Sequence, residues 1–209
     1  MNKIYIELSN LKKSYKQSSG PVTLFNNLNI KIKEGELVAL VGPSGSGKTS
    51  LLHLLALLDE PTRGKIILNN IDTEKFTNNE KDKIRRKNIS IIFQDNNLLT
   101  DFTAIENVKM PLIIKDENKE LISKKAEQIL KDLKILDRSN HFPNQLSGGE
   151  QQRVAIARAL IAETKIILAD EPTGNLDFKT SKEIFSIFLK LKKLKKTIIF
   201  ATHNRELAN

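Results

Sequence analysis

The sequence of 209 residues contains no cysteine and no tryptophan, and it lacks any long apolar run. Without cysteine the chain can form neither disulfides nor thiolate metal sites, which is compatible with a reducing cytosol. The longest apolar segment, 51–58, is interrupted by His53 and is far shorter than the roughly 20 residues that span a bilayer. The first residues also lack the apolar stretch of an export signal. We therefore expect a chain that neither crosses a membrane nor carries a secretion signal.

Acidic residues are in the minority, since 34 Lys and Arg face 25 Asp and Glu, for a net charge of +9. Lysines cluster at 81–87 and 190–196, so nucleic acid or an anionic membrane surface has to be considered as a partner. No aromatic residue interleaves with these basic runs. Because base stacking needs aromatic side chains, a solvated lysine face is favoured and no specific nucleic-acid partner is predicted.

Apolar patterns typical of strands and of helices alternate along the chain, which predicts an α/β fold. Four nearly continuous apolar runs are typical of strands covered on both faces, and they predict a buried, mostly parallel sheet. Alternating patterns predict half-exposed strands in an antiparallel N-terminal β region, and wider spacings predict helices. The buried runs are 37–41, 89–93, 166–169 and 197–201, the half-exposed strands 3–8, 28–32 and 64–68, and the helices 47–58, 121–136, 154–161 and 184–194.

The stretch from Gln94 to Gln152 contains no convincing strand. Its asparagine-rich start and the expected break at Pro111 indicate a helical insertion rather than a linker. We predict a single domain over 1–209, with a nucleotide-binding core at about 1–93 and 160–209 and a helical subdomain at about 94–159.

Residues 42–49, Gly-Pro-Ser-Gly-Ser-Gly-Lys-Thr, match the phosphate-loop pattern G-x-x-x-x-G-K-[ST] between a buried strand and a predicted helix. Its glycines let the backbone wrap around phosphates, and the helix N-terminus attracts their charge. Lys48 can reach the β- and γ-phosphates, and the Thr49 hydroxyl can bind Mg²⁺. An ordinary glycine-rich turn is the structural alternative, and the strand–loop–helix context argues against it. The predicted ATP-binding residues here are Gly42, Pro43, Ser44, Gly45, Ser46, Gly47, Lys48, Thr49 and Ser50.

The buried run 166–169 ends in two carboxylates, Asp170 and Glu171. Burying such a pair is unfavourable unless a cation or metal compensates, as a metal-bound nucleotide would. Because strand residues alternate sides, we assign Asp170 to Mg²⁺ and Glu171 to the general base for water in line with the γ-phosphate. Taken alone, a helix cap or a surface turn is the more common explanation of an acidic pair. Together with the phosphate loop, the catalytic interpretation is favoured.

Residues 146–153, Leu-Ser-Gly-Gly-Glu-Gln-Gln-Arg, resemble the signature sequence of ABC ATPases and precede a predicted helix, as in that family. Ser147, Gly148 and Gly149 at a helix start would make a second phosphate-binding N-terminus. One chain would then carry two half-sites for one anion. A serine cap followed by glycines would be the better explanation of Ser-Gly-Gly alone, but the full eight-residue match favours the family.

This resemblance implies further roles, in the order expected of the family. Tyr15 is similar to the aromatic residue that stacks on adenine, and Gln94 to the glutamine that senses the γ-phosphate and Mg²⁺. Residues 174–177 resemble the D-loop, which adds Asp177 to the ATP-binding set, and His203 resembles the switch histidine that contacts the γ-phosphate. Each is a weak signal alone, because surface packing, a turn or a helix cap would explain it.

The implied catalytic residues are thus Glu171 and His203, and the implied Mg²⁺ ligands Thr49, Gln94 and Asp170. The other two histidines, His53 and His141, are expected to be structural. Family members usually continue past the switch histidine with further strands and a helix, whereas this sequence stops at Asn209.

Within the family, 51–64, 106–112 and 168–177 resemble the lipoprotein-releasing ATPases (LolD type), which act with two transmembrane subunits on lipoproteins of the bacterial inner membrane. The resemblance implies the P-loop NTPase fold of ABC ATPases, ATP and Mg²⁺ as ligands, and a head-to-tail dimer with a second copy. It also implies transmembrane permease partners and a peripheral position at the cytoplasmic face of the inner membrane. Macrolide-exporter and cell-division ATPases share much of these segments and remain alternatives.

Two other classes of function are less well supported. A soluble ABC ATPase acting on nucleic acid would suit the positive charge, but the sequence holds one cassette and no long coiled-coil insertion between Lys48 and Ser147. A non-hydrolysing binding module is opposed by the presence of Glu171 and His203.

Overall fold

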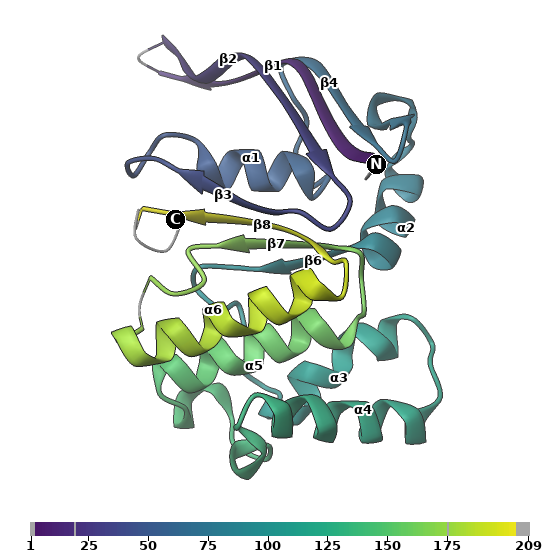
Figure 1. Cartoon of the computed structure of the whole chain (residues 1–209), viewed down its shortest axis with the longest axis vertical. Helices are drawn as coiled ribbons and strands as arrows, with labels where there is room; N and C mark the ends of the chain where they lie inside the picture. Colours follow the sequence, from purple (N-terminus) through teal and green to yellow (C-terminus); the bar gives the residue numbers. More distant parts are fainter. Residues whose placement is uncertain (1–2, 19, 175, 204–209) are drawn as a thin grey trace.

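The computed structural model describes residues 3–18, 20–174 and 176–203, and within them two four-stranded sheets are packed with helices (Figure 1). Short 3-10 turns lie at Thr73–Lys75, Leu136–Arg138 and Pro143–Gln145. The strands are β1 (Ile4–Gln17), β2 (Gly20–Lys33), β3 (Leu37–Val41), β4 (Arg63–Leu68), β5 (Ile71–Asp72), β6 (Ile89–Ile92), β7 (Ile166–Asp170) and β8 (Thr197–Thr202). The helices are α1 (Lys48–Leu55), α2 (Asn78–Asn88), α3 (Ala104–Ile114), α4 (Lys119–Asp132), α5 (Gly148–Ile161) and α6 (Phe178–Lys193).

The four predicted buried strands form one parallel sheet in the order β3-β8-β7-β6. Successive residues of β8 pack on opposite faces, with Ile198 and Phe200 against α5 and α6, and Ile199 and Ala201 against α1. Figure 1 shows α1 on one side of this sheet and α5 and α6 on the other. The predicted α/β class and parallel sheet are confirmed. β3 is only half-buried, contrary to expectation, because it is an edge strand with a single neighbour in its sheet.

The N-terminal β region forms an antiparallel sheet in the order β2-β1-β4-β5. β1 and β2 each span 14 residues, much longer than the predicted 3–8 and 28–32. The pairing of β1 with β2 shifts register between Leu8 and Leu11, where Asn10 has φ 51°. Such a bulge interrupts the alternation of exposed and buried residues, so a pattern of period two stops there although the strand continues.

The segment between β6 and β7 contains no strand within the described residues, as predicted. The prediction for Pro111 was wrong, since it lies inside α3 and the helix continues to Ile114. α2 was also not predicted, because it buries none of its residues and therefore has no apolar periodicity. Its start is instead defined by a capping box, in which the Thr77 N–H donates to Glu80 Oε2 at 2.8 Å.

Candidate functional site

The candidate site lies at the carboxyl edge of the parallel sheet. The register aligns Val41 with Thr202, Asp170 with Ala201, and Ile92 with Ala169. Because all four strands run in the same direction, the segments that follow them meet at the same edge, where open α/β sheets bind ligands. These segments carry most of the predicted site residues, namely the phosphate loop after β3, Gln94 after β6, Glu171 after β7 and His203 after β8.

The phosphate loop joins β3 to α1 through two glycines in the left-handed region. Gly45 has φ 79° and Gly47 has φ 89°, backbone conformations that other residues adopt only with strain. Gly47 is also the N-cap of α1, and no side chain caps the helix there. The first N–H groups of α1 therefore have no side-chain cap and are available to donate hydrogen bonds to an anion.

Lys48 lies across the phosphate loop. Its Nζ donates to the carbonyls of Gly42 at 2.9 Å and Pro43 at 3.1 Å, and it lies 3.8 Å from Glu171 Oε1. Only 11% of the Lys48 side chain is exposed. The ammonium group is thus a nearly buried cation held at the mouth of the loop, which suits phosphate oxygens.

Glu171 occupies a strained position directly after β7. Its φ is 45°, which is uncommon for a residue other than glycine, and its N–H donates to the Ala201 carbonyl at 3.1 Å. The carboxylate lies between two possible hydrogen-bond donors, Lys48 on Oε1 and His203 Nδ1 on Oε2 at 3.0 Å. The structure therefore brings together a cation, a carboxylate and an imidazole that are far apart in the sequence.

Asp170 has different surroundings from Glu171. It is buried at the end of β7, and its Oδ1 has no hydrogen-bond partner within the described residues. A buried carboxylate oxygen without a partner is unfavourable unless a cation binds it. No group of three or more His, Cys, Asp or Glu in the described part of the chain could hold a metal ion. Mg²⁺ that arrives with a nucleotide needs only one or two protein ligands, so Asp170 and the exposed Thr49 fit such an ion.

Tyr15 on β1 is tied to α1 and to the loop after it. Its hydroxyl donates to Asp59 Oδ2 at 2.9 Å and lies 3.4 Å from Ser50 Oγ. Burial alone would raise the pKa of Asp59, but hydrogen bonds from Lys13, the Glu60 N–H and Tyr15 lower it overall. Tyr15 and Ser50 were predicted from the sequence, whereas Lys13 and Asp59 were not. The available signal was that Lys13 lies two residues before Tyr15, on the same face of a strand.

The signature segment begins α5. Ser147 is its N-cap and forms a capping box with Glu150, since the Ser147 N–H donates to Glu150 Oε2 at 2.8 Å. A Cβ built on Gly148 would meet nothing within 4 Å, so the helix start is open on that side. α5 and α1 pack on opposite faces of the sheet, and no hydrogen bond or ion pair within the described residues joins Ser147–Gly149 to the phosphate loop.

The remaining predicted residues lie around these elements. Asp177 caps α6 by accepting from the Thr180 N–H at 3.0 Å and hydroxyl at 2.6 Å, and these bonds lower the pKa of Asp177. Asn175, also in the predicted D-loop, lies outside the described residues. Gln94 is exposed in the turn after β6.

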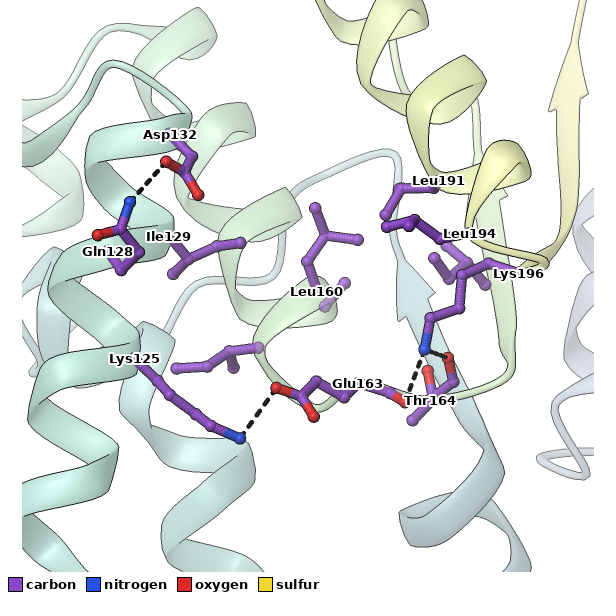
Figure 2. Close-up of a pocket in the computed structure, with 13 residues that line it drawn as sticks. Lys125, Gln128, Ile129, Asp132, Leu160, Glu163, Thr164, Leu191, Leu194 and Lys196 are labelled. Atoms are coloured by element: carbon purple, nitrogen blue, oxygen red, sulfur yellow. Dashed lines mark hydrogen bonds and ion pairs between the residues drawn. The ribbon is translucent and has the colours of Figure 1, made fainter.

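A separate hollow of about 290 Å³ lies between α4, the end of α5 and the end of α6 (Figure 2). Its walls include Ile129, Leu160 and Leu191, and at its rim Lys125 pairs with Glu163 at 2.9 Å. None of the predicted site residues lines it. The hollow is therefore separate from the candidate nucleotide site.

Comparison with known proteins identifies the family. A family model described as ABC transporter matches residues 25–174. The chain belongs to the ABC transporter family. As a member of it, the chain is an ATP-hydrolysing cassette. Within the described residues of this ABC cassette, no helix is long and apolar enough to cross a membrane.

Relatives extend the similarity over the whole cassette. This chain is 49% identical over 209 residues to the lipoprotein-releasing system ATP-binding protein LolD of Rickettsia bellii, and the alignment covers 100% of this chain and 92% of the relative. Identity to the LolD protein of Rickettsia prowazekii is 47% over 210 residues, covering 100% and 93%. Among solved structures, a dimeric ATP-binding cassette in a post-hydrolysis state bound to ADP and Pi is 44% identical with a TM-score of 0.92, covering 97% of this chain and 90% of that one.

Proposed function

We propose that this ABC cassette binds MgATP, hydrolyses it between two copies of the chain, and drives transmembrane permease subunits. The observation that carries the proposal is the convergence of Lys48, Glu171 and His203 at the mouth of the phosphate loop. A phosphate cradle alone would serve a binding module. A carboxylate next to that cradle adds a group that can take a proton from water.

In the proposed mechanism, the loop N–H groups and Lys48 bind the β- and γ-phosphates. Glu171 accepts the proton of the water that attacks the γ-phosphorus, and His203, 3.0 Å from Glu171, orients this carboxylate and contacts the γ-phosphate. Asp170 and Thr49 would hold Mg²⁺, with Gln94 as a further ligand. When bound, the ion neutralises charge that develops on the phosphate oxygens.

We further propose that each ATP is completed by the signature of a second copy. Ser147–Gly149 form an open helix start. Within the described residues, no hydrogen bond or ion pair joins this helix start to the phosphate loop of the same chain. A head-to-tail dimer would bring the two half-sites onto one nucleotide, and Asp177 at the start of α6 would lie in the D-loop of that interface. The dimeric state of the solved cassette with ADP and Pi supports this arrangement.

The transported substrate is proposed from the relatives. Both Rickettsia proteins are named as components of a lipoprotein-releasing system, so release of lipoproteins from the bacterial inner membrane is the favoured process. Macrolide-exporter and cell-division systems are the alternatives. The cassette would then act as a peripheral protein on the cytoplasmic face of that membrane.

The permease is proposed to dock beside Gln94. A hollow of about 550 Å³ lies between α2, β6 and α3, and its apolar walls include Phe93, Met110 and Ile114. This surface joins the core, at about 1–93 and 160–209, to the proposed helical subdomain at about 94–159. The two parts share one continuous apolar cluster, which supports a single ATP-binding domain.

Phosphate release and ATP binding by the purified chain test the proposal, with Glu171→Gln as the matched control. ATP-dependent phosphate release that is lost in the variant is expected. Phosphate release that persists in Glu171→Gln at the rate of the unmodified chain would instead contradict the role proposed for this carboxylate.

A further inference from the structure

An ion pair beside the candidate site has no part in the proposed chemistry. Lys13 Nζ on β1 lies 2.7 Å from both carboxylate oxygens of Asp59 and donates to the Glu60 carbonyl at 2.8 Å. Only 8% of the Lys13 side chain is exposed. Because a buried lysine without a partner is strongly unfavourable, this pair fixes the position of both side chains.

The same pair holds Tyr15 from two directions. The Tyr15 hydroxyl donates to Asp59 Oδ2 at 2.9 Å, and Lys13 Nζ lies 4.6 Å from the centroid of the Tyr15 ring. A cation at this distance over a ring occupies one face of it. A flat ligand can therefore stack only on the opposite face, and the ring remains accessible because Tyr15 is 39% exposed.

The hydroxyl contact also sets where the ring stands. Ser50 Oγ lies 3.4 Å from the Tyr15 hydroxyl, and Ser50 follows Thr49 in the first turn of α1. The ring is thus anchored next to the end of the phosphate loop. A ring that is already held in place loses less conformational freedom when a ligand stacks on it, so affinity rises without an added contact.

We propose that Lys13 and Asp59 are positioning residues that present one face of Tyr15 to the base of the nucleotide, and so set the preference for ATP over bare triphosphate. This inference rests on the proposed function, because the role of Tyr15 as a base platform comes from the family resemblance. A purely structural link between β1 and the loop after α1 is the competing explanation. It predicts equal effects on every ligand of the phosphate loop.

Titration calorimetry with MgATP and with magnesium tripolyphosphate separates these explanations. Tripolyphosphate reaches the phosphate loop but has no base to stack on Tyr15. Asp59→Asn and Lys13→Met should each weaken ATP binding by about tenfold, within the range of base–aromatic stacking, and leave tripolyphosphate affinity unchanged. Tyr15→Phe, which removes only the hydroxyl, should have a smaller effect of the same kind. Glu60→Gln is the matched control, because its carboxylate pairs with Lys81 at 2.6 Å and does not touch Tyr15.

A double-mutant cycle completes the test. In a Tyr15→Ala background, Asp59→Asn should have no further effect on ATP affinity, since the residue it positions is gone. Equal losses for ATP and tripolyphosphate, additive effects in the cycle, or an unchanged ATP preference in both Asp59→Asn and Tyr15→Phe would each overturn the inference while leaving the proposed function intact. If the unmodified chain bound neither ligand, the inference and the proposed function would both be wrong.

Discussion

His203 Nδ1 lies 3.0 Å from Glu171 Oε2. The two residues follow neighbouring parallel strands, β8 and β7, so the sheet itself brings an imidazole onto the carboxylate. The other oxygen of the same carboxylate faces Lys48 at 3.8 Å. The group proposed to accept a proton is thereby held between Lys48 and His203, the proposed switch histidine.

Replacing Lys48 with alanine should weaken binding of MgATP. Its ammonium group would contact the β- and γ-phosphates already in the ground state, and a hydrogen bond to a charged group contributes about 1.5–3 kcal/mol, or at least tenfold in affinity. Calorimetry on Lys48→Ala measures the loss, with Lys31→Ala as a control on an exposed lysine that pairs with Glu7. An ATP affinity equal to that of the control would remove Lys48 from the phosphate site.

The parallel sheet and the phosphate loop were predictable because both are determined by short segments of consecutive residues. The apolar runs of β7 and β8 are continuous, and both strands are buried along their whole length. The phosphate loop needs its glycines and Lys48 at fixed spacings along the chain. Such features depend on neighbours in sequence, so a single sequence contains them.

The elements that escaped prediction depend on tertiary context or on weak local signals. α2 has a single apolar residue, Ile84, which is too few for a periodic pattern, and α3 tolerates Pro111 in its interior. The Lys13–Asp59 pair joins β1 to the loop after α1. β2, β3 and α1 separate the two residues in the sequence, so no periodicity relates them. The contact of Glu171 with His203 likewise depends on the order of the strands, which places β8 beside β7.

Replacing Arg158 with lysine should destabilise the fold. Its guanidinium donates to the carbonyls of Asn96 and Asn97, each at 2.7 Å, and both asparagines have positive φ. A lysine ammonium lacks the planar fork that reaches two adjacent carbonyls, so we expect a loss of about 1–2 kcal/mol in the free energy of unfolding. Urea denaturation measures it. Arg138→Lys, at a more exposed ion pair with Glu150, should change stability by less than about 0.5 kcal/mol. Equal losses of stability in Arg158→Lys and Arg138→Lys would contradict a stabilising role for the two hydrogen bonds of Arg158.

Glu150 should make stability depend on acid pH. Its pKa lies below the ordinary 4.5, mainly because the Ser147 N–H donates to it, with smaller help from the Ser147 side chain and Arg138. A carboxyl group with a lowered pKa in the folded state stabilises the fold above its unfolded pKa, and this contribution is lost as pH falls through the folded value.

We therefore expect the free energy of unfolding to fall less in Glu150→Gln than in the unmodified chain as the pH is lowered from about 5 to about 3. The measurement is urea denaturation at several pH values in that window. Glu127→Gln, at an exposed position of α4, is the matched control. Identical pH profiles for Glu150→Gln and the unmodified chain would show that the capping carboxylate is not selectively stabilised in the folded state.

Replacing Glu171 with glutamine tests whether ATP is hydrolysed between two copies with Glu171 as the base. The amide keeps the size of the carboxylate but cannot accept the proton of the attacking water, so ATP binding should persist while hydrolysis stops. With hydrolysis blocked, ATP should hold the closed dimer together by mass action. Adding Ser147→Arg should abolish the dimer, because the larger side chain obstructs the signature cap over the γ-phosphate.

Size-exclusion chromatography with light scattering on Glu171→Gln, in MgATP and in MgADP, is the most direct measurement. We expect a dimer in MgATP, a monomer in MgADP, and a monomer in both for the double variant Glu171→Gln, Ser147→Arg. A monomer under both nucleotides, in protein shown by calorimetry to bind ATP, would contradict the composite site, and undiminished phosphate release by Glu171→Gln would contradict the assignment of the base.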